Sequence, residues 1–129
     1  MAGESDLEKL WAALEPVLQP GEFVYCAAPD VIGTPVCVFR EAEAVTLVLR
    51  REEAERLEVA FTYPCRMITL TVHSSLEAVG LLARITAILA DRGISVNAVS
   101  AYFHDHLFVP VDRAEEALAA LRTGRRNRP

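Results

Sequence analysis

The chain has 129 residues, of which 52% are hydrophobic and 24% are charged, and its formal net charge is −5. This composition predicts a packed globular protein, either one domain or two very small units that share a core, and it excludes a disordered chain. The negative charge disfavours nucleic-acid binding, so we expect no nucleic-acid partner. No apolar run approaches the roughly 20 residues of a membrane span, so we expect no membrane partner.

The N-terminal segment is predicted to form an amphipathic helix. Its acidic first residues lack the basic start and the apolar core of a signal peptide, so we expect a cytoplasmic protein. Ser5 and Glu8 have the spacing of a capping box, and Pro16 is expected to bend or stop the helix. The predicted helical face consists of Leu7, Leu10, Trp11, Leu14 and Leu18.

Four short strands and one short helix are predicted in the rest of the first half. Residues 22–28 have the pattern of an interior strand, and residues 36–39 and 45–49 are expected to pair as a hairpin. Residues 50–57 are predicted to form one or two helical turns, and residues 58–61 a short strand. Cys26, Cys37 and Cys65 lie far apart without a CxxC spacing, which indicates inert strand thiols rather than disulfides or zinc ligands.

The stretch from residue 66 to residue 121 has the clearest periodicity. Apolar residues alternate over residues 68–72 as in a strand and recur over residues 81–89 as in a helix that Gly93 ends. Residues 94–103 and 106–111 are predicted to form a hairpin around His104 and Asp105. A last helix after Asp112 has an inner stripe of Ala114, Ala117, Leu118 and Leu121. The order strand, helix, strand, strand, helix predicts an α+β fold of the ferredoxin-like βαββαβ type without its final strand.

Two segments of this stretch have a recognisable pattern: residues 77–85 read EAVGLLARI and residues 89–97 read LADRGISVN. Both segments resemble ACT domains. ACT domains commonly have an acidic residue, two variable positions, Gly-Leu-Leu, an apolar helix, Gly-Ile and an Asn. The resemblance is strongest over residues 68–121, although Ala78-Val79 stands where many ACT domains have a proline or a polar residue.

The whole chain resembles a group of short bacterial proteins with two ACT-like halves, through phrases such as ITLTVHSSLEAVG at residues 68–80 and YFHDHLFVPV at residues 102–111. The resemblance implies two units with antiparallel sheets and helices on one face. Residues 1–63 are expected to form the first unit, lacking a first strand, and residues 64–124 the second, followed by a basic flexible tail at 125–129. We hypothesise that the halves share a sheet or exchange strands, since each lacks one strand.

The loop before the first helix of the second unit is the predicted ligand site. Gly80 lets the backbone approach a ligand, and the N–H groups at the helix start favour a carboxylate. Asn97 adds an amide on the second strand, whose start we expect beside the end of the first strand. ACT domains commonly bind amino acids at the interface of paired domains, so the resemblance implies a regulatory, non-catalytic sensor of an amino acid. The predicted ligand-binding residues are Ser74, Ser75, Leu76, Glu77, Ala78, Val79, Gly80, Leu81 and Asn97.

A metal site is the main alternative. His104, Asp105 and His106, with His73, have the ligand chemistry of zinc or iron, and would make the chain a small metal-binding protein or metal-dependent enzyme. A third hypothesis, RNA binding on an open sheet, would need exposed aromatic and basic residues on one sheet face, and we rank it last. Neither a nucleophile elbow nor a phosphate-binding glycine motif occurs, so we expect no catalytic residue and no cofactor.

Self-association is expected from the resemblance, because ACT domains usually pair side by side. We therefore predict an intrachain pair of units or a homo-oligomer, with a dimer favoured. A chain with no catalytic domain of its own would act on a separate partner protein, so a regulated protein partner is a further expectation.

Overall fold

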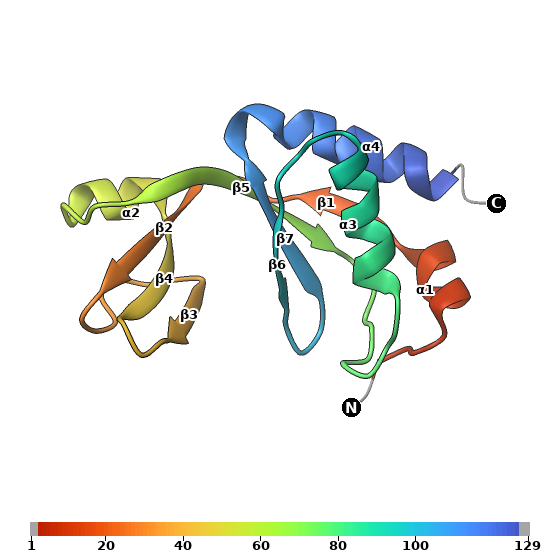
Figure 1. The fold of residues 1–129 in the computed structure, drawn as a ribbon, viewed down its shortest axis with the longest axis horizontal. Helices are drawn as coiled ribbons and strands as arrows, with labels where there is room; N and C mark the ends of the chain where they lie inside the picture. Colours follow the sequence, from red (N-terminus) through yellow and green to blue (C-terminus); the bar gives the residue numbers. More distant parts are fainter. Residues whose placement is uncertain (1–2, 127–129) are drawn as a thin grey trace.

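The computed structural model describes residues 3–126, which form a seven-stranded antiparallel sheet with four α-helices on one of its faces (Figure 1). No helix among these residues combines the length and the apolar character that a membrane span requires. The elements in chain order are α1 (Leu7–Ala13), β1 (Pro16–Leu18), β2 (Phe23–Ala28), β3 (Cys37–Arg40), β4 (Val45–Arg50), α2 (Arg51–Arg56), β5 (Thr62–Leu70), α3 (Leu81–Asp91), β6 (Asn97–Ser100), β7 (Asp105–Pro110), the 3₁₀ turn η1 (Val111–Arg113) and α4 (Ala114–Arg126).

The nine-residue strand β5 lies at the centre of the sheet. The path of the sheet runs β3-β4-β2-β5-β7-β6, and β1 also pairs with β5. The first part of β5 pairs with β2, through Thr62 and Cys65, whereas its last part pairs with β1, from Ile68 to Leu70. Strand β7 pairs along the other edge of β5. One strand therefore belongs to both halves of the sheet.

The second unit contains β5, α3, β6, β7 and α4, and the N-terminal strand β1 supplies the strand that its own sequence lacks. The resulting order β1-β5-β7-β6 completes the ferredoxin-like βαββαβ arrangement. The first unit contains β2, β3, β4, α2 and the start of β5, with a loop at residues 29–36 where a first helix would stand. The hypothesis that the halves share a sheet and exchange a strand is confirmed.

The unit boundaries expected from the sequence meet the structure at two places. The division expected between residues 63 and 64 falls inside β5. The sequence predicts that the first half lacks its first strand. In the structure its missing element is instead the helix between β2 and β3. Helix α4 continues to Arg126, and residues 127–129 of the expected tail lie outside the described residues.

The N-terminal helix is shorter than predicted. Helix α1 ends at Ala13, Leu14 has an extended backbone, and Pro16 opens β1, so Leu18 lies on a strand. Proline opposes a helix because it has no N–H donor and its ring meets the preceding turn. The helix cap is Asp6 rather than Ser5, because the Asp6 carboxylate accepts hydrogen bonds from the N–H groups of Glu8 and Lys9.

Two other predicted elements differ in detail. Residues 58–61 form no strand, and the paired strand begins at Thr62. The β6–β7 hairpin forms as predicted, but Asp105 is the first residue of β7, where it pairs with Ser100. The turn lies at residues 101–104, and the Ala101 N–H donates to the His104 carbonyl at 3.0 Å.

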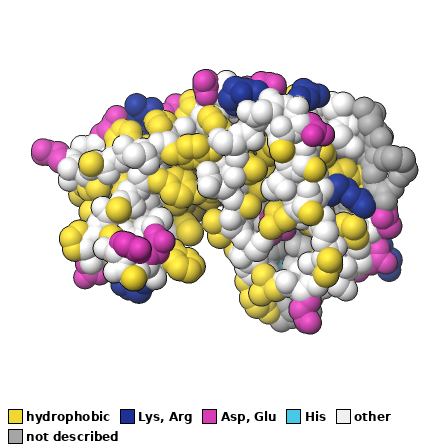
Figure 2. Space-filling model, viewed as in Figure 1, with side chains coloured by type: hydrophobic (Ala, Val, Ile, Leu, Met, Phe, Trp, Pro, Cys, Tyr) yellow, Lys and Arg dark blue, Asp and Glu magenta, His cyan; other side chains and the backbone are white. Residues whose placement is uncertain are grey.

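Apolar side chains cover both faces of the sheet. A large cluster packs β5 and β7 against α1, α3 and α4, and a smaller one packs β2 and β4 against α2. The predicted inner stripe of α4 is buried. On the helix-free face, the Phe108 ring lies 6.0 Å from Phe23 and 5.9 Å from Tyr25, in edge-to-face geometry. In the view of Figure 2, the surface has a hollow between the two ends of the sheet, and hydrophobic side chains lie along it.

The three cysteines lie on strands without disulfides. Burial raises the pKa of the Cys65 thiol to about 12 and also raises the pKa of Cys26. Both thiols therefore stay protonated at neutral pH. The reactive form of cysteine is the thiolate, so these two residues are not suited to be nucleophiles.

Candidate functional site

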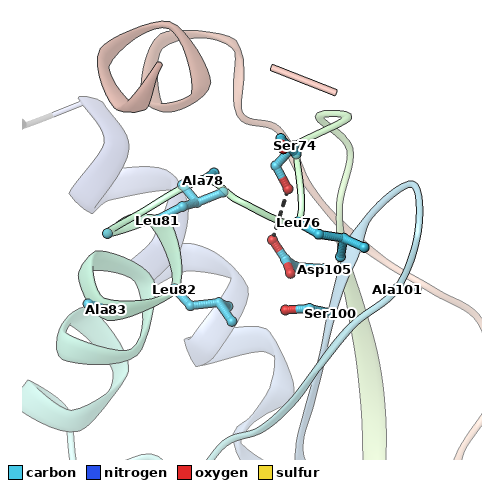
Figure 3. Close-up of a pocket in the computed structure, with 11 residues that line it drawn as sticks. Ser74, Leu76, Ala78, Leu81, Leu82, Ala83, Ser100, Ala101 and Asp105 are labelled. Carbon is cyan, nitrogen blue, oxygen red and sulfur yellow. Dashed lines mark hydrogen bonds between the residues drawn. The ribbon is translucent and has the colours of Figure 1, made fainter. Parts of the chain in front are cut away.

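A pocket of about 120 Å³ lies among the loop after β5, the first turn of α3 and the β6–β7 hairpin (Figure 3). The segments come together because β5 and β6 run in the same direction on either side of β7, so their ends are level. Leu70 at the end of β5 pairs with Asp105, and Asp105 pairs with Ser100 at the end of β6. The lining residues are Ser74, Ser75, Leu76, Ala78, Gly80, Leu81, Leu82, Ala83, Ser100, Ala101 and Asp105.

The loop between β5 and α3 turns tightly before the helix begins. The N–H groups of Glu77 and Ala78 donate to the side chain and the carbonyl of Ser75, both at 3.0 Å. Gly80 then adopts φ +100°, a left-handed conformation that residues with a Cβ rarely take. A Cβ at this position would stand 3.1 Å from Cδ2 of Leu7 in α1. Gly80 therefore allows both the turn and the close approach of α1.

The first turn of α3 opens into this pocket without a side-chain cap. The Arg84 N–H donates to the Gly80 carbonyl at 3.0 Å, which is the first bond of the helix ladder. The N–H groups of Leu81, Leu82 and Ala83 therefore have no partner within the helix. Such a helix start carries a partial positive charge and favours an anion.

Asp105 and Ser74 form the polar part of the opposite wall (Figure 3). Only 6% of Asp105 and 8% of Ser74 is exposed. The Ser74 hydroxyl donates to Oδ2 of Asp105 at 3.3 Å. A carboxylate from the hairpin is thereby tied to the loop that follows β5.

A short N-terminal strap holds the same loop from outside. Glu4 pairs with Ser74 in a parallel bridge. The Glu4 N–H donates to the His73 carbonyl at 2.8 Å, and the Ser75 N–H donates to the Glu4 carbonyl at 2.7 Å. The Glu8 carboxylate in α1 lies 3.7 Å from the Arg84 guanidinium in α3. The N-terminal segment thus braces both the loop and the helix of the pocket.

Comparison with protein families decides the classification of this fold. Two ACT domain models match the chain, one over residues 2–66 and the other over residues 62–123. The chain belongs to the ACT domain family. The two matches meet within β5, the strand that the two ACT units share. A search of curated proteins finds no match.

Solved structures with the same fold agree with this classification. A protein of unknown function from Vibrio cholerae is 38% identical with a TM-score of 0.82, over 92% of this chain and 96% of that one. A protein from Agrobacterium tumefaciens is 18% identical with a TM-score of 0.70, over 86% and 88%. The regulatory subunit of aspartate kinase from Thermus flavus is 10% identical with a TM-score of 0.63, over 85% and 96%. The last two similarities show the fold alone.

The structure places most of the predicted ligand residues at one ACT pocket. Ser74, Ser75, Leu76, Ala78, Gly80 and Leu81 all line it. Glu77 and Val79 are in the same loop but do not line the pocket, and 82% of Val79 is exposed.

Asn97 lies at the far end of β6, away from this pocket. Asn97 pairs with Phe108, whereas the residue of β6 that lines the pocket is Ser100, at the other end of the strand. The expectation that the start of the second strand lies beside the end of the first is wrong, because these two strands run in the same direction. Residues at the end of β6 take the place that was expected for Asn97.

Sequence reasoning missed the part of the pocket that comes from α3 and the hairpin. Leu82 and Ala83 follow the predicted loop directly, and only the uncapped helix start pointed to them. Ser100 and Ala101 carried no sequence signal. The sequence around Asp105 indicates a turn residue, because aspartate is favoured in tight turns, or a metal ligand between two histidines.

The residues of the alternative metal site are not brought together. Asp105 and His106 are neighbours on β7, so their side chains point to opposite faces of the sheet. The rings of His104 and His106 lie 6.3 Å apart. Among residues 3–126, no group of three histidine, cysteine or carboxylate side chains is placed to hold one metal ion.

A second cavity, of about 130 Å³, lies on the helix-free face between the two units. Its polar member is His106, whose Nδ1 lies 3.0 Å from the Thr69 hydroxyl oxygen, and Gln19 donates to that oxygen at 3.1 Å. Burial, followed by the nearby His104, lowers the pKa of His106, so its neutral form is favoured. The cavity is lined by Val36, Cys37, Met67, Val99, Ala101, His106 and Phe108.

Exposed apolar side chains lie on the two segments that line the first pocket, the loop after β5 and the β6–β7 hairpin. Leu76 and Val79 are 66% and 82% exposed on the loop, and Tyr102 and Phe103 are 52% and 54% exposed on the hairpin turn. The Tyr102 and Phe103 rings lie 4.9 Å apart, and the His73 ring lies 5.1 Å from Phe103. We call these four apolar side chains, together with the half-buried His73, the mouth cluster. Grouped exposed apolar side chains of this kind mark interaction surfaces.

Proposed function

We propose that this ACT protein is a non-catalytic regulatory module that senses an amino acid in the pocket between the β5–α3 loop and the β6–β7 hairpin. The observation that carries the proposal is the uncapped start of α3, which opens into this pocket beside Gly80. Free N–H groups at a helix start are suited to a carboxylate, and every amino acid carries one. The regulatory subunit among the structural neighbours supports the regulatory part of the proposal.

The pocket combines apolar walls with a few polar groups, as small-molecule sites commonly do. Its volume of about 120 Å³ is suited to a molecule with few atoms. Leucine and alanine side chains lie beside serine and aspartate in its wall. The proposal assigns no catalytic residue to the chain. The effect of ligand binding would pass to a partner protein. The existence of that partner and a cytoplasmic location stay predictions from the sequence.

A second copy of the chain is the proposed cover of the pocket. The mouth cluster would lose its contact with water in a side-by-side pair, and a ligand between the copies would touch both. We therefore expect a homodimer, and we expect an amino acid that fills the pocket to strengthen it. Light scattering after gel filtration measures this, and a monomer with and without the amino acid would contradict it.

A thermal-shift screen against the twenty amino acids tests the proposed function. A compound at one hundred times its Kd stabilises the folded state by about 2.7 kcal/mol, which raises the Tm of a domain of this size by about 10 °C. We expect one or a few amino acids to raise the Tm. If none does at millimolar concentration, the amino-acid proposal is wrong.

The same screen with zinc and with a chelator tests the metal alternative. We expect neither addition to change the Tm, because the structure separates Asp105 from His106. A chelator that lowers the Tm, with zinc restoring it, would favour the metal-binding alternative and contradict the sensor proposal.

A further inference from the structure

We propose that Asp105 holds the ammonium group of the bound amino acid and makes the pocket selective for zwitterions over simple carboxylates. The inference rests on the proposed function, because it identifies the second anchor of the same site. Asp105 is suited to this role by its position. Its backbone is paired on one side with Leu70 of β5 and on the other with Ser100 of β6, so the carboxylate is carried by a fixed strand.

The Asp105 carboxylate is buried without a counter-charge. Only 6% of the residue is exposed. Within residues 3–126 no lysine or arginine forms an ion pair with it, and the Ser74 hydroxyl is the hydrogen-bond donor to its side chain. A carboxylate removed from water without a cation costs free energy. A cationic group in the pocket would remove this cost.

The opposite wall of the pocket has the complementary electrostatic character. Figure 3 shows Asp105 on one side and the first turn of α3, with Leu81 to Ala83, on the other. The helix start favours a negative group and Asp105 favours a positive one. An α-amino acid carries both groups on its Cα. A ligand with only one of them would leave one wall without its partner.

The size of the pocket restricts the side chain of the amino acid. The volume is about 120 Å³, and Leu76, Leu82 and Ala101 contribute apolar walls. Glycine, L-alanine and L-serine are therefore the probes that match both the charges and the volume.

Calorimetric titration of the wild-type protein with matched pairs of compounds tests the ammonium anchor. The pairs are glycine and acetate, L-alanine and propionate, and L-serine and 3-hydroxypropionate, in which the second compound lacks only the ammonium group. We expect at least one amino acid to bind, with its partner binding at least about tenfold more weakly, since a charge-assisted hydrogen bond is lost. Equal affinity within a pair would overturn the inference and leave the amino-acid sensor standing.

The Asp105→Asn variant gives the second measurement. It keeps the shape of the side chain and removes its charge, so the Kd for the amino acid should rise at least about tenfold. Asp112→Asn is the matched control, because Asp112 is exposed on η1 and the change in net charge is the same. An unchanged Kd in folded Asp105→Asn overturns the anchor. If this variant does not fold, the compound pairs still decide the question.

Failure of this inference can be distinguished from failure of the proposed function. If none of glycine, L-alanine and L-serine binds, the anchor for small zwitterions is overturned. If another of the twenty amino acids still raises the Tm in that case, the sensor proposal survives. If no amino acid does, both are overturned.

Discussion

Among single residues, Gly80 has the strictest backbone requirement in the pocket. Its φ of +100° lies in the left-handed region, and α1 approaches it so closely that a Cβ would stand 3.1 Å from Leu7. Gly93, which ends α3, has φ +67° and no atom within 4 Å of an added Cβ. The two glycines therefore differ in crowding although both have a positive φ.

We predict that Gly80→Ala destabilises the protein more than Gly93→Ala does. A left-handed backbone costs a residue with a Cβ about 1–2 kcal/mol, and contact with Leu7 adds to this cost at position 80 alone. Urea denaturation of both variants measures the free energies of unfolding. Equal losses, or a larger loss in Gly93→Ala, would show that α1 does not constrain the loop.

The predicted residues that line the pocket are local to one loop. They lie between Ser74 and Leu81, and Gly80 marks the turn into the helix. Asp105 enters the pocket only because β5, β7 and β6 align, and Asn97 is excluded by the direction of β6. Strand direction and strand pairing depend on segments that are far apart in the chain. The spacing of residues within the loop or within the hairpin does not predict them.

At the scale of elements, Phe108 of β7 joins the two units on the helix-free face. Its ring is 1% exposed and contacts Phe23 and Tyr25, which belong to β2 of the first unit. Met67 and Cys65 of the shared strand belong to the same cluster, as do Val48 of β4 and Val99 of β6. Phe108 is therefore the buried aromatic side chain that the hairpin contributes to the contact between the units on this face.

We predict that Phe108→Ala lowers the free energy of unfolding by about 3–5 kcal/mol, as expected when a large buried ring leaves a cavity. Phe39→Ala is the control, because Phe39 is 67% exposed on β3 and its loss should cost less than about 0.5 kcal/mol. Guanidinium denaturation followed by circular dichroism gives both values. Similar losses for the two variants would contradict the role assigned to Phe108.

The predicted elements were accurate where the apolar residues followed one periodicity, that of a helix or that of a strand. They were wrong where both periodicities could be fitted. The strand at residues 68–70, helix α3 and the inner stripe of α4 follow from clear alternation or helical spacing. Leu14 and Leu18 fit a helix by spacing, but Pro16 interrupts it, and the second residue lies on β1. The partner of β1 is fifty or more residues away, so its pairing could not be predicted locally.

For the whole molecule, the N-terminal segment is an integral part of the second ACT unit. Strand β1 pairs with the end of β5, and Leu10, Trp11 and Leu14 are buried in the core beneath α3 and α4. Residues 62–126 alone would lack one strand and these three buried side chains.

We predict that a fragment of residues 62–129 shows no cooperative thermal transition, in contrast to the full chain. Each buried leucine removed from a core costs about 2–5 kcal/mol, and a whole domain is stable by only about 5–15 kcal/mol. Adding a peptide of residues 1–21 should restore the transition, and a peptide with Leu10 and Leu14 changed to aspartate should not. A fragment that melts cooperatively by itself would contradict this view.

The exchange of β1 also sets the order in which the molecule can be completed during synthesis. A ribosome makes β1 before β5, the strand that it pairs with, and before α4, the helix that contacts it; these emerge about fifty to one hundred residues later. Strands β2, β3 and β4 have their partners nearby and can assemble early. Contacts between distant segments slow folding, so we expect β1 to be among the last strands to reach its native place.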